Sequence, residues 1–303
     1  MLTWANEHQD EYLNEMLRLE GRGYPAIYLT CGGCGRADPT FRCEHQTCYG
    51  PSLFCQPCIV QRHAVLPTHW IQQWDGKYFV RQSLKDLGLV IQLGHPAGTS
   101  CPNSTKVHKD FVLIDVTGIH DIALNYCLCD SNIKERQQLM RVCWWPATVR
   151  TLQTCATFAV VRLFQTLNCL GKVSAHNFLK SLELLTNNDG LVPVPDRRRA
   201  FHHIVCQYRI TLMMKHAGRG HDPSGVHGTA QGELALWCHA CPQAGINLPD
   251  GWDNINWDAM PEDLRCVSFF FRGGEGLQFW SLLQASRYKY FFSSHRIAIF
   301  GSL

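Results

Sequence analysis

Cysteine and histidine are the residues through which this chain could do chemistry. The sequence holds 16 Cys and 15 His among 303 residues. Nine of them fall in residues 31–69, and eight of these have the spacing of metal ligands: Cys31, Cys34, Cys43, Cys48, Cys55, Cys58, His63 and His69. Two thiolates separated by two residues can grip one tetrahedral ion through a tight turn. The sequence starts with polar and acidic residues, so we expect no secretory leader, and metal ligation rather than disulfide bonds.

Eight ligands suffice for two closed, four-coordinate zinc sites. In an interleaved arrangement, the first ion is held by Cys31, Cys34, Cys55 and Cys58, and the second by Cys43, Cys48, His63 and His69. This order of ligands resembles the cross-braced B-box and ZZ fingers. A closed site leaves no position for a substrate water, so both ions are expected to be structural. The alternative is a set of buried, unliganded thiols, which two CxxC pairs and a trailing His pair disfavour.

The ligands of the second site are open to an alternative. The order of Cys34, Cys43, His45 and Cys48 begins like a RING finger. A RING then needs another Cys at position 51, where this chain has Pro, which disfavours a RING and a ubiquitin-ligase function. His45 could still replace Cys43 or Cys48 as a ligand.

Two further sites are less strongly marked. A third site could be built from His95, Cys101, Cys127 and Cys129, with His108 and His120 as rival ligands. Residues two apart on a strand face the same side, so both thiolates of the Cys127-x-Cys129 pair can point at one ion. A fourth site could use the CxxC pair Cys238 and Cys241, with His221 and His227 upstream. Ordinary buried thiols are the alternative at both places. The expected cofactor is Zn²⁺, with two ions in the first cluster and room for a third and fourth.

Two other groups of residues invite a chemical interpretation. Asp115 ends a hydrophobic run, FVLIDV, where RNase H-type enzymes place a metal-binding Asp. That chemistry needs further carboxylates converging on Mg²⁺, and nothing in the sequence brings Asp121 or Asp130 to it, so we favour a turn or capping role.

Arg197, Arg198 and Arg199 open a helix, where their charge is unfavourable unless an anion is bound. They are candidate DNA contacts, against the alternative of a solvated helix face. No Walker A, GxSxG or HExxH motif is present.

The elements that must position these residues are short. A helix is expected over 5–20, with Leu13, Met16 and Leu17 on one face. The stretch from 77 to 129 reads as strands, with a tight connection at Thr117-Gly118. Beyond 130 the pattern becomes helical: one helix has Val160, Leu163, Phe164 and Leu167 as its apolar stripe, one is capped by Ser174, and one runs over 197–215.

Composition narrows the class of protein. Hydrophobic residues make up 46% and charged residues 17%, which excludes a mostly disordered chain. No stretch approaches the roughly 18 apolar residues of a membrane span, so no membrane partner is expected. The net charge of +3 is compatible with a local nucleic-acid-binding patch but does not by itself predict one. The fold class is expected to be α+β: small zinc-stabilised irregular modules and a small β-sheet, followed by a mainly α-helical region.

A resemblance to a known family runs through most of these motifs. The chain resembles the region upstream of the catalytic domain in KDZ (Kyakuja-Dileera-Zisupton) transposases, with its CxC-like cysteine cluster. The matching runs cover residues 4 to about 265 and include EYLNEMLRLEGRG, CGGCG, LFCQPCIVQRHAVLPTH, DFVLIDVTGIHDIALNYCLC, KVSAHNFLKSLELLTNNDG and GELALWCHACPQAGINLPDGW. The Cys43-x4-Cys48 spacing departs from the two-residue gap usual in the family.

The resemblance implies a zinc-binding accessory region of a nuclear DNA transposase, with DNA as its partner. The family's catalytic domain opens with a strand ending in DANF, whose Asp is catalytic. This chain instead continues as CVSFFFRGGEG to its last residue, so we expect it to be non-catalytic and truncated before the catalytic core.

Six segments follow from the motifs. They are an N-terminal helix (1–25), a cross-braced zinc module (26–75), a strand-rich CxC region (76–150), a helical region (151–220), a CxxC loop region (221–265) and a divergent tail (266–303). The main functional hypothesis is a DNA-binding or assembly module. The alternatives are a B-box-like protein-interaction or self-association module, and a fragment of an active transposase.

Overall fold

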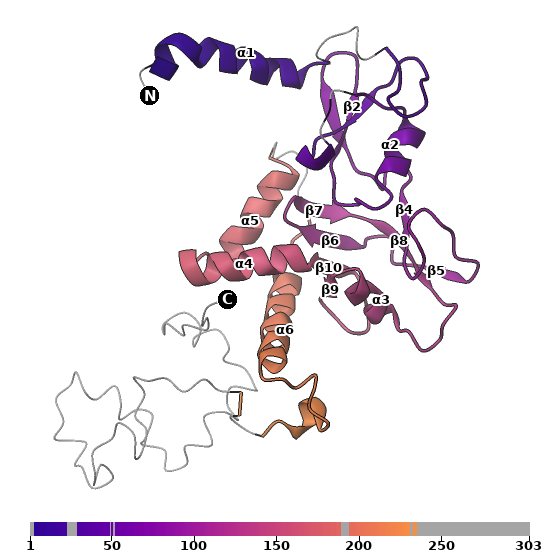
Figure 1. Ribbon diagram of the computed structural model, residues 1–303, viewed down its shortest axis with the longest axis vertical. Helices are drawn as coiled ribbons and strands as arrows, with labels where there is room; N and C mark the ends of the chain where they lie inside the picture. Colours follow the sequence, from indigo (N-terminus) through magenta and orange to yellow (C-terminus); the bar gives the residue numbers. More distant parts are fainter. Residues whose placement is uncertain are drawn as a thin grey trace, which may run out of the picture. The chain divides into compact units, whose positions relative to one another are not determined.

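The computed structural model describes residues 3–22, 29–48, 50, 52–188, 194–230 and 233–234. The chain divides into two compact units, Met1–Arg209 and Ile210–Leu303. The expected α+β class is confirmed, because helices and small sheets alternate along the first unit, and Cys and His gather in clusters between them (Figure 1).

The first part of the chain forms a small three-stranded sheet and short helices. The antiparallel sheet has the order β1-β2-β3, with β1 (Phe41–Cys43), β2 (Ile71–Trp74) and β3 (Phe79–Gln82). The helical pieces are η1 (Trp4–His8), α1 (Gln9–Glu20), η3 (Gln46–Cys48) and α2 (Gln56–Arg62). The core beside this sheet is small and contains Phe41, Ile59, Ile71, Leu84 and Leu89.

Two mixed sheets follow. One has the order β4-β8-β5, from β4 (Val90–Gln92), β8 (Ala123–Cys127) and β5 (Ser104–Lys106). The other has the order β7-β6-β10-β9, from β7 (Gly118–Asp121), β6 (Val112–Asp115), β10 (Thr154–Thr157) and β9 (Trp144–Pro146). The β6–β7 hairpin turns where the sequence predicted a tight connection. Gly118 is required there, because its φ is +135° and a Cβ would lie 2.8 Å from Oγ1 of Thr186.

Four helices complete the described part of the first unit and lead into the second. They are α3 (Glu135–Arg141), α4 (Phe158–Gly171), α5 (Ala175–Thr186) and α6 (Arg198–His216). The predicted cap is confirmed, since the Ser174 side chain accepts a hydrogen bond from the backbone N–H of Asn177. Helices α4, α5 and α6 lie beside the four-stranded sheet (Figure 1). Each contributes one phenylalanine to a ring cluster, Phe164, Phe178 and Phe201, whose ring centroids are 5.1–5.8 Å apart.

Three expectations about these elements are corrected. The chain is not helical throughout from residue 130, because β9 and β10 occupy 144–146 and 154–157. The α4 stripe is rotated: Val160, Val161 and Phe164 are buried, while Leu163 and Leu167 are exposed. The helix near the start exists, but no residue of α1 is buried, so its apolar stripe faces no core formed by the described residues.

The described residues of the second unit form short local structure. The end of α6 is followed by η4 (Gly225–Gly228), and Arg219 forms an ion pair with Asp222 at 2.8 Å. In the described part of the chain, every helix is too short or too polar to cross a membrane.

The aromatic contact between α4, α5 and α6 yields a stability prediction. Phe201 is 0% exposed, so Phe201→Ala should lower the free energy of unfolding by about 3–5 kcal/mol, measured by urea denaturation of the metal-loaded chain. Leu170→Ala is the control: Leu170 is 84% exposed, and its loss should change stability by less than about 0.5 kcal/mol. A Phe201 variant as stable as the control would contradict this packing.

Candidate metal centres

The first cluster brings together the two CxxC pairs. The Sγ atoms of Cys31, Cys34, Cys55 and Cys58 all lie within 4.8 Å of one another, and Cys55 Sγ is 3.6 Å from both Cys31 Sγ and Cys34 Sγ. Four sulfurs around a tetrahedral ion with bonds of about 2.3 Å are about 3.8 Å apart, so the spacing fits one zinc. The first CxxC turn requires a glycine, because a Cβ at Gly33 would lie 2.9 Å from Cys58 Sγ.

Backbone N–H groups prepare one thiol of this cluster for ligation. Cys31 Sγ accepts hydrogen bonds from the N–H of Gly33 (3.4 Å) and of Cys55 (3.3 Å). Burial raises the pKa of Cys31, but these backbone donors outweigh burial and bring the pKa to about 6. A thiol with such a pKa is largely ionised at neutral pH, and the thiolate is the form that binds metal.

The second cluster is built from three other parts of the chain. Cys43 ends β1, Cys48 ends η3, and His63 and His69 follow α2. Nδ1 of His69 lies 3.4 Å from the Sγ atoms of both Cys43 and Cys48, and Nε2 of His63 lies 3.4 Å from Cys48 Sγ. Nitrogen and sulfur ligands of one tetrahedral zinc are about 3.6 Å apart, so this set also fits.

The two histidines are held in a form that can ligate. The Nδ1–H of His63 donates to the carbonyl of Ile59 at 2.7 Å, which leaves Nε2 free to face the thiols. Burial lowers the pKa of His63, and burial together with the nearby His45 lowers the pKa of His69 to about 4. Both rings are therefore neutral at pH 7.

His45 lies beside the second cluster rather than in it. Its ring stacks on that of His69 with 4.1 Å between centroids. Its Nδ1 accepts the backbone N–H of Thr47 at 3.2 Å, and its own backbone N–H donates to Cys43 Sγ at 3.3 Å. The structure thus places Cys43 and Cys48 in the four-residue group and leaves His45 as a neighbour that orients them.

The third cluster joins the loop after β4 to the end of β8. Nε2 of His95 lies 3.2 Å from Cys127 Sγ and 3.7 Å from Cys129 Sγ, and Cys101 Sγ lies 3.5 Å from Cys129 Sγ. The backbone N–H of Cys129 donates to Cys127 Sγ and lowers the pKa of Cys127 to about 7. His108, a rival ligand, is exposed and lies beside Asp110 instead.

Helix α3 is tied directly to this third cluster. The side-chain amide of Gln138 accepts the backbone N–H of Cys127 at 2.9 Å and donates to the Cys127 carbonyl at 2.7 Å. Gln138 is buried, so both of its bonds are shielded from water. The position of α3 therefore depends on β8, the strand that ends at Cys127 of this cluster.

The proposed fourth site falls largely beyond the described structure. Cys238 and Cys241 lie outside the described residues, as does the tail from 266. His221 and His227 are exposed, and neither belongs to a metal-binding group among the residues that the structure describes.

Asp115 is part of a buried polar joint rather than an array of carboxylates. Its Oδ1 accepts the hydroxyl of Thr157 at 2.6 Å, and its Oδ2 accepts that of Thr117 at 2.9 Å. Nε2 of His120, the other rival ligand, lies 2.8 Å from Oγ1 of Thr117. Asp121 and Asp130 are exposed, and the three metal-binding groups found among the described residues contain only Cys and His. This supports the capping role expected from the sequence.

The same joint connects the segment that carries the first two clusters to the four-stranded sheet. Trp70 donates through Nε1 to the Thr117 carbonyl at 3.0 Å and stacks on His120 with 4.4 Å between ring centroids. Arg81 binds Glu44 at 2.6 Å and the carbonyls of Leu185 and Thr186. Sequence reasoning missed this joint, because its members are scattered in sequence and share no spacing.

The arginine run opens α6, as expected, but its members differ. Arg198 forms an ion pair with Asp196 at 2.7 Å and a hydrogen bond with Nδ1 of His176. Arg197 is half-buried, and its Nε has no hydrogen-bond partner in the structure. Arg199 is exposed and forms no ion pair or hydrogen bond with the side chain of another residue that the structure describes.

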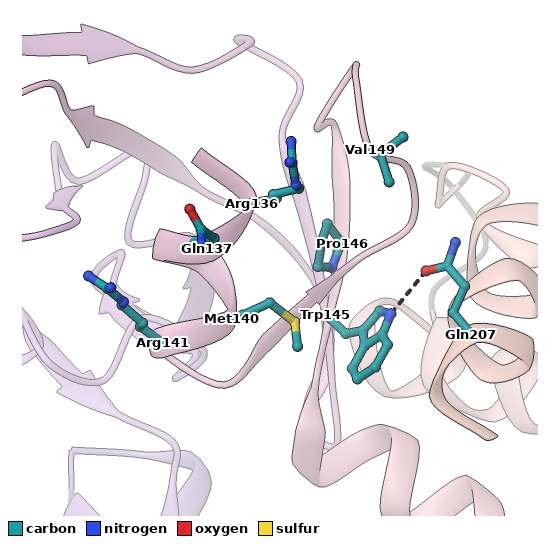
Figure 2. Close-up of a pocket in the computed structure, with 8 residues that line it drawn as sticks. All are labelled: Arg136, Gln137, Met140, Arg141, Trp145, Pro146, Val149 and Gln207. Carbon is teal, nitrogen blue, oxygen red and sulfur yellow. Dashed lines mark hydrogen bonds between the residues drawn. The ribbon is translucent and has the colours of Figure 1, made fainter. Parts of the chain in front are cut away.

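A shallow pocket of about 520 Å³ was also missed. It lies between α3, β9 and α6 and is lined by Arg136, Gln137, Met140, Arg141, Trp145, Pro146, Val149 and Gln207 (Figure 2). These residues come from three separate elements, so no local sequence pattern marks the pocket.

Taken together, three clusters in the described structure could hold metal ions, and their Cys and His composition is consistent with zinc. Such ions would be structural, because each cluster offers four protein ligands.

Metal content tests the three clusters. Cys34→Ser, Cys48→Ser and Cys129→Ser should each remove one zinc relative to the parent chain, because each variant leaves only three protein ligands in its cluster. Cys169→Ser is the matched control, since Cys169 is exposed and outside all three groups. The measurement is zinc per folded chain by mass spectrometry of the elements. Unchanged zinc in any of the three variants would rule out that cluster.

The buried joint makes stability depend on pH. Burial lowers the pKa of His120 to about 4, whereas the unfolded chain protonates this ring near 6.5. Its contribution is therefore complete above pH 6.5 and is lost as the pH falls from there toward 4. The free energy of unfolding of His120→Gln should fall less steeply between pH 7.5 and 5 than that of the parent. His176→Gln, at an exposed position, should keep the parental slope.

Comparison with known proteins bears on one part of the chain. Neither a curated protein nor a solved structure matches this chain. Residues 84–190 match the family model described as a CxC2-like cysteine cluster associated with KDZ transposases. The match contains all four residues of the third cluster and the joint around Asp115 and His120. The resemblance inferred from sequence is thereby confirmed, and the chain carries a KDZ-transposase-associated domain over residues 84–190.

Proposed function

We propose that this chain is a non-catalytic, zinc-organised module that binds duplex DNA for a KDZ-type transposase in the nucleus. The main observation in support of this proposal is the composition of α6. Its 19 residues include four Arg or Lys and three His, with no Asp or Glu. A helix with one sign of charge along its length is the electrostatic pattern of a surface that contacts phosphates.

The exposed side of α6 within the first unit is where this charge is available. Phe201, Ile204 and Val205 are buried against the core, so the opposite side, with Arg199 and His203, faces solvent. Arg209 is engaged by Gln165 and Asn168 and supports the helix instead. The metal clusters have no open coordination position in this proposal and serve to hold the fold.

The lack of catalysis is part of the same proposal. Its support is the environment of Asp115, whose two oxygens are taken by the hydroxyls of Thr117 and Thr157. Two-metal strand transfer needs several carboxylates facing a common ion. In the part of the chain that the structure describes, the metal-binding groups are formed by thiols and imidazoles alone.

Salt-dependent binding tests the DNA proposal. The zinc-loaded full chain should bind a mixed-sequence duplex of about 30 base pairs, measured by fluorescence anisotropy. Its affinity should fall linearly with salt on logarithmic axes, because phosphate contacts release counterions. Arg199→Glu should weaken binding at least about fivefold at low salt, through loss of one contact and added repulsion.

Lys77→Glu provides the matched control. It makes the same change of charge at an exposed position in the turn between β2 and β3, and should weaken binding much less. No detectable binding at low salt with zinc bound would overturn the proposal. If both variants weaken DNA binding equally, α6 is not the surface that contacts DNA.

A further inference from the structure

Helix α1 presents an apolar surface that nothing in the described chain covers. Five side chains on one side are 52–68% exposed: Tyr12, Leu13, Met16, Leu17 and Leu19. No residue of α1 is buried. Helices of this length are marginal in water without packing. An exposed apolar stripe on such a helix therefore indicates a surface that binds a partner.

The charge around this stripe indicates what kind of partner fits. The segment Trp4–Glu20 contains five acidic residues and one Arg, a net charge of 1 − 5 = −4. Glu11 lies beside His8, and Glu15 is bound by Arg18 at 2.7 Å. Asp10 and Glu20 form no ion pair with any residue that the structure describes, and the helical repeat places both beside the stripe. Two copies of α1 would repel each other, so its partner should be apolar and basic.

The pocket between α3, β9 and α6 has that character. Its apolar lining comes from Met140, Pro146 and Val149, and Arg136 and Arg141 flank it (Figure 2). No acidic residue lines it. Within the described structure, neither arginine side chain forms an ion pair or hydrogen bond with another residue.

The pocket is also preformed. The indole Nε1 of Trp145 donates to Oε1 of Gln207 at 3.0 Å, which fixes one wall (Figure 2). Trp145 is only 8% exposed and its ring lies against those of Phe158 and Tyr208, with centroids 5.7 and 5.6 Å away, so little of its surface is open to a ligand. A nucleobase would thus find no free aromatic face on which to stack, whereas aliphatic side chains of a helix would find an apolar floor.

We propose that α1 of one copy docks its apolar stripe into this pocket on a second copy. Met16 and its neighbours would occupy the apolar floor, and Asp10 and Glu20 would approach Arg136 and Arg141. If the exchange is reciprocal it closes a dimer, and if it is one-way it extends into a chain. The inference is independent of DNA binding, because it uses none of the α6 residues assigned to phosphate contact.

A charge exchange tests this proposal. The zinc-loaded full chain should self-associate in sedimentation velocity over a range of concentrations. Arg136→Glu/Arg141→Glu and Asp10→Lys/Glu20→Lys should each weaken association at least about tenfold, since like charges then face each other. The chain that carries all four substitutions should regain most of the parental association. Met16→Ala should weaken it without changing charge.

Arg162→Glu/Lys172→Glu is the matched control, because both residues are exposed on or next to α4 and neither lines the pocket. Zinc content and circular dichroism report whether each variant folds. A parental chain that stays monomeric at all concentrations would overturn the proposal, as would a four-fold variant that shows no recovery. Loss of DNA binding with unchanged association in the Arg136→Glu/Arg141→Glu variant would assign the pocket to phosphate instead.

Discussion

The constraint on which this structure depends is the convergence of thiols and imidazoles on three points. The first sheet has only five buried residues in its core. So small a core cannot offset the conformational entropy of the 60 or so residues around it. Structural zinc contributes on the order of 10–16 kcal/mol to modules of this kind. The spacing of the metal ligands therefore determines the fold here, as the periodicity of apolar residues does in domains with a larger core.

The clusters are not isolated from the rest of the first unit. Trp70 follows His69 directly and reaches the β6–β7 hairpin through Thr117 and His120. Gln138 holds α3 against the backbone of Cys127. Both contacts pair polar groups away from water, where an unpaired partner is costly. The metal-bearing loops and the apolar core thus support one another through a few directional bonds.

The sequence predicted those features that depend on local spacing. Cysteine intervals indicated the three groups that the structure brings together, and Ser174 marked the start of α5. Features that depend on contacts between distant segments could not be predicted from the sequence. Strand β10 is short and buried, and its pairing with β6 is parallel and long-range, so it lacks the alternation that marks an exposed strand. The pocket and the Asp115 joint each combine residues from several elements. The rotation of the α4 stripe reflects how α5 and α6 pack on it, which no single helix encodes.

The two hydrogen bonds of Gln138 have a consequence for regulation. They join Cys127 of the third cluster to α3, which forms one wall of the pocket, so an ion that fixes Cys127 also fixes that wall. Any ligand that binds the pocket only when α3 is in place must raise the affinity of the third cluster for its ion, and the ion must raise the affinity for that ligand by the same factor. The supply of zinc would then set not only how much of this protein is folded but also how much of it is assembled.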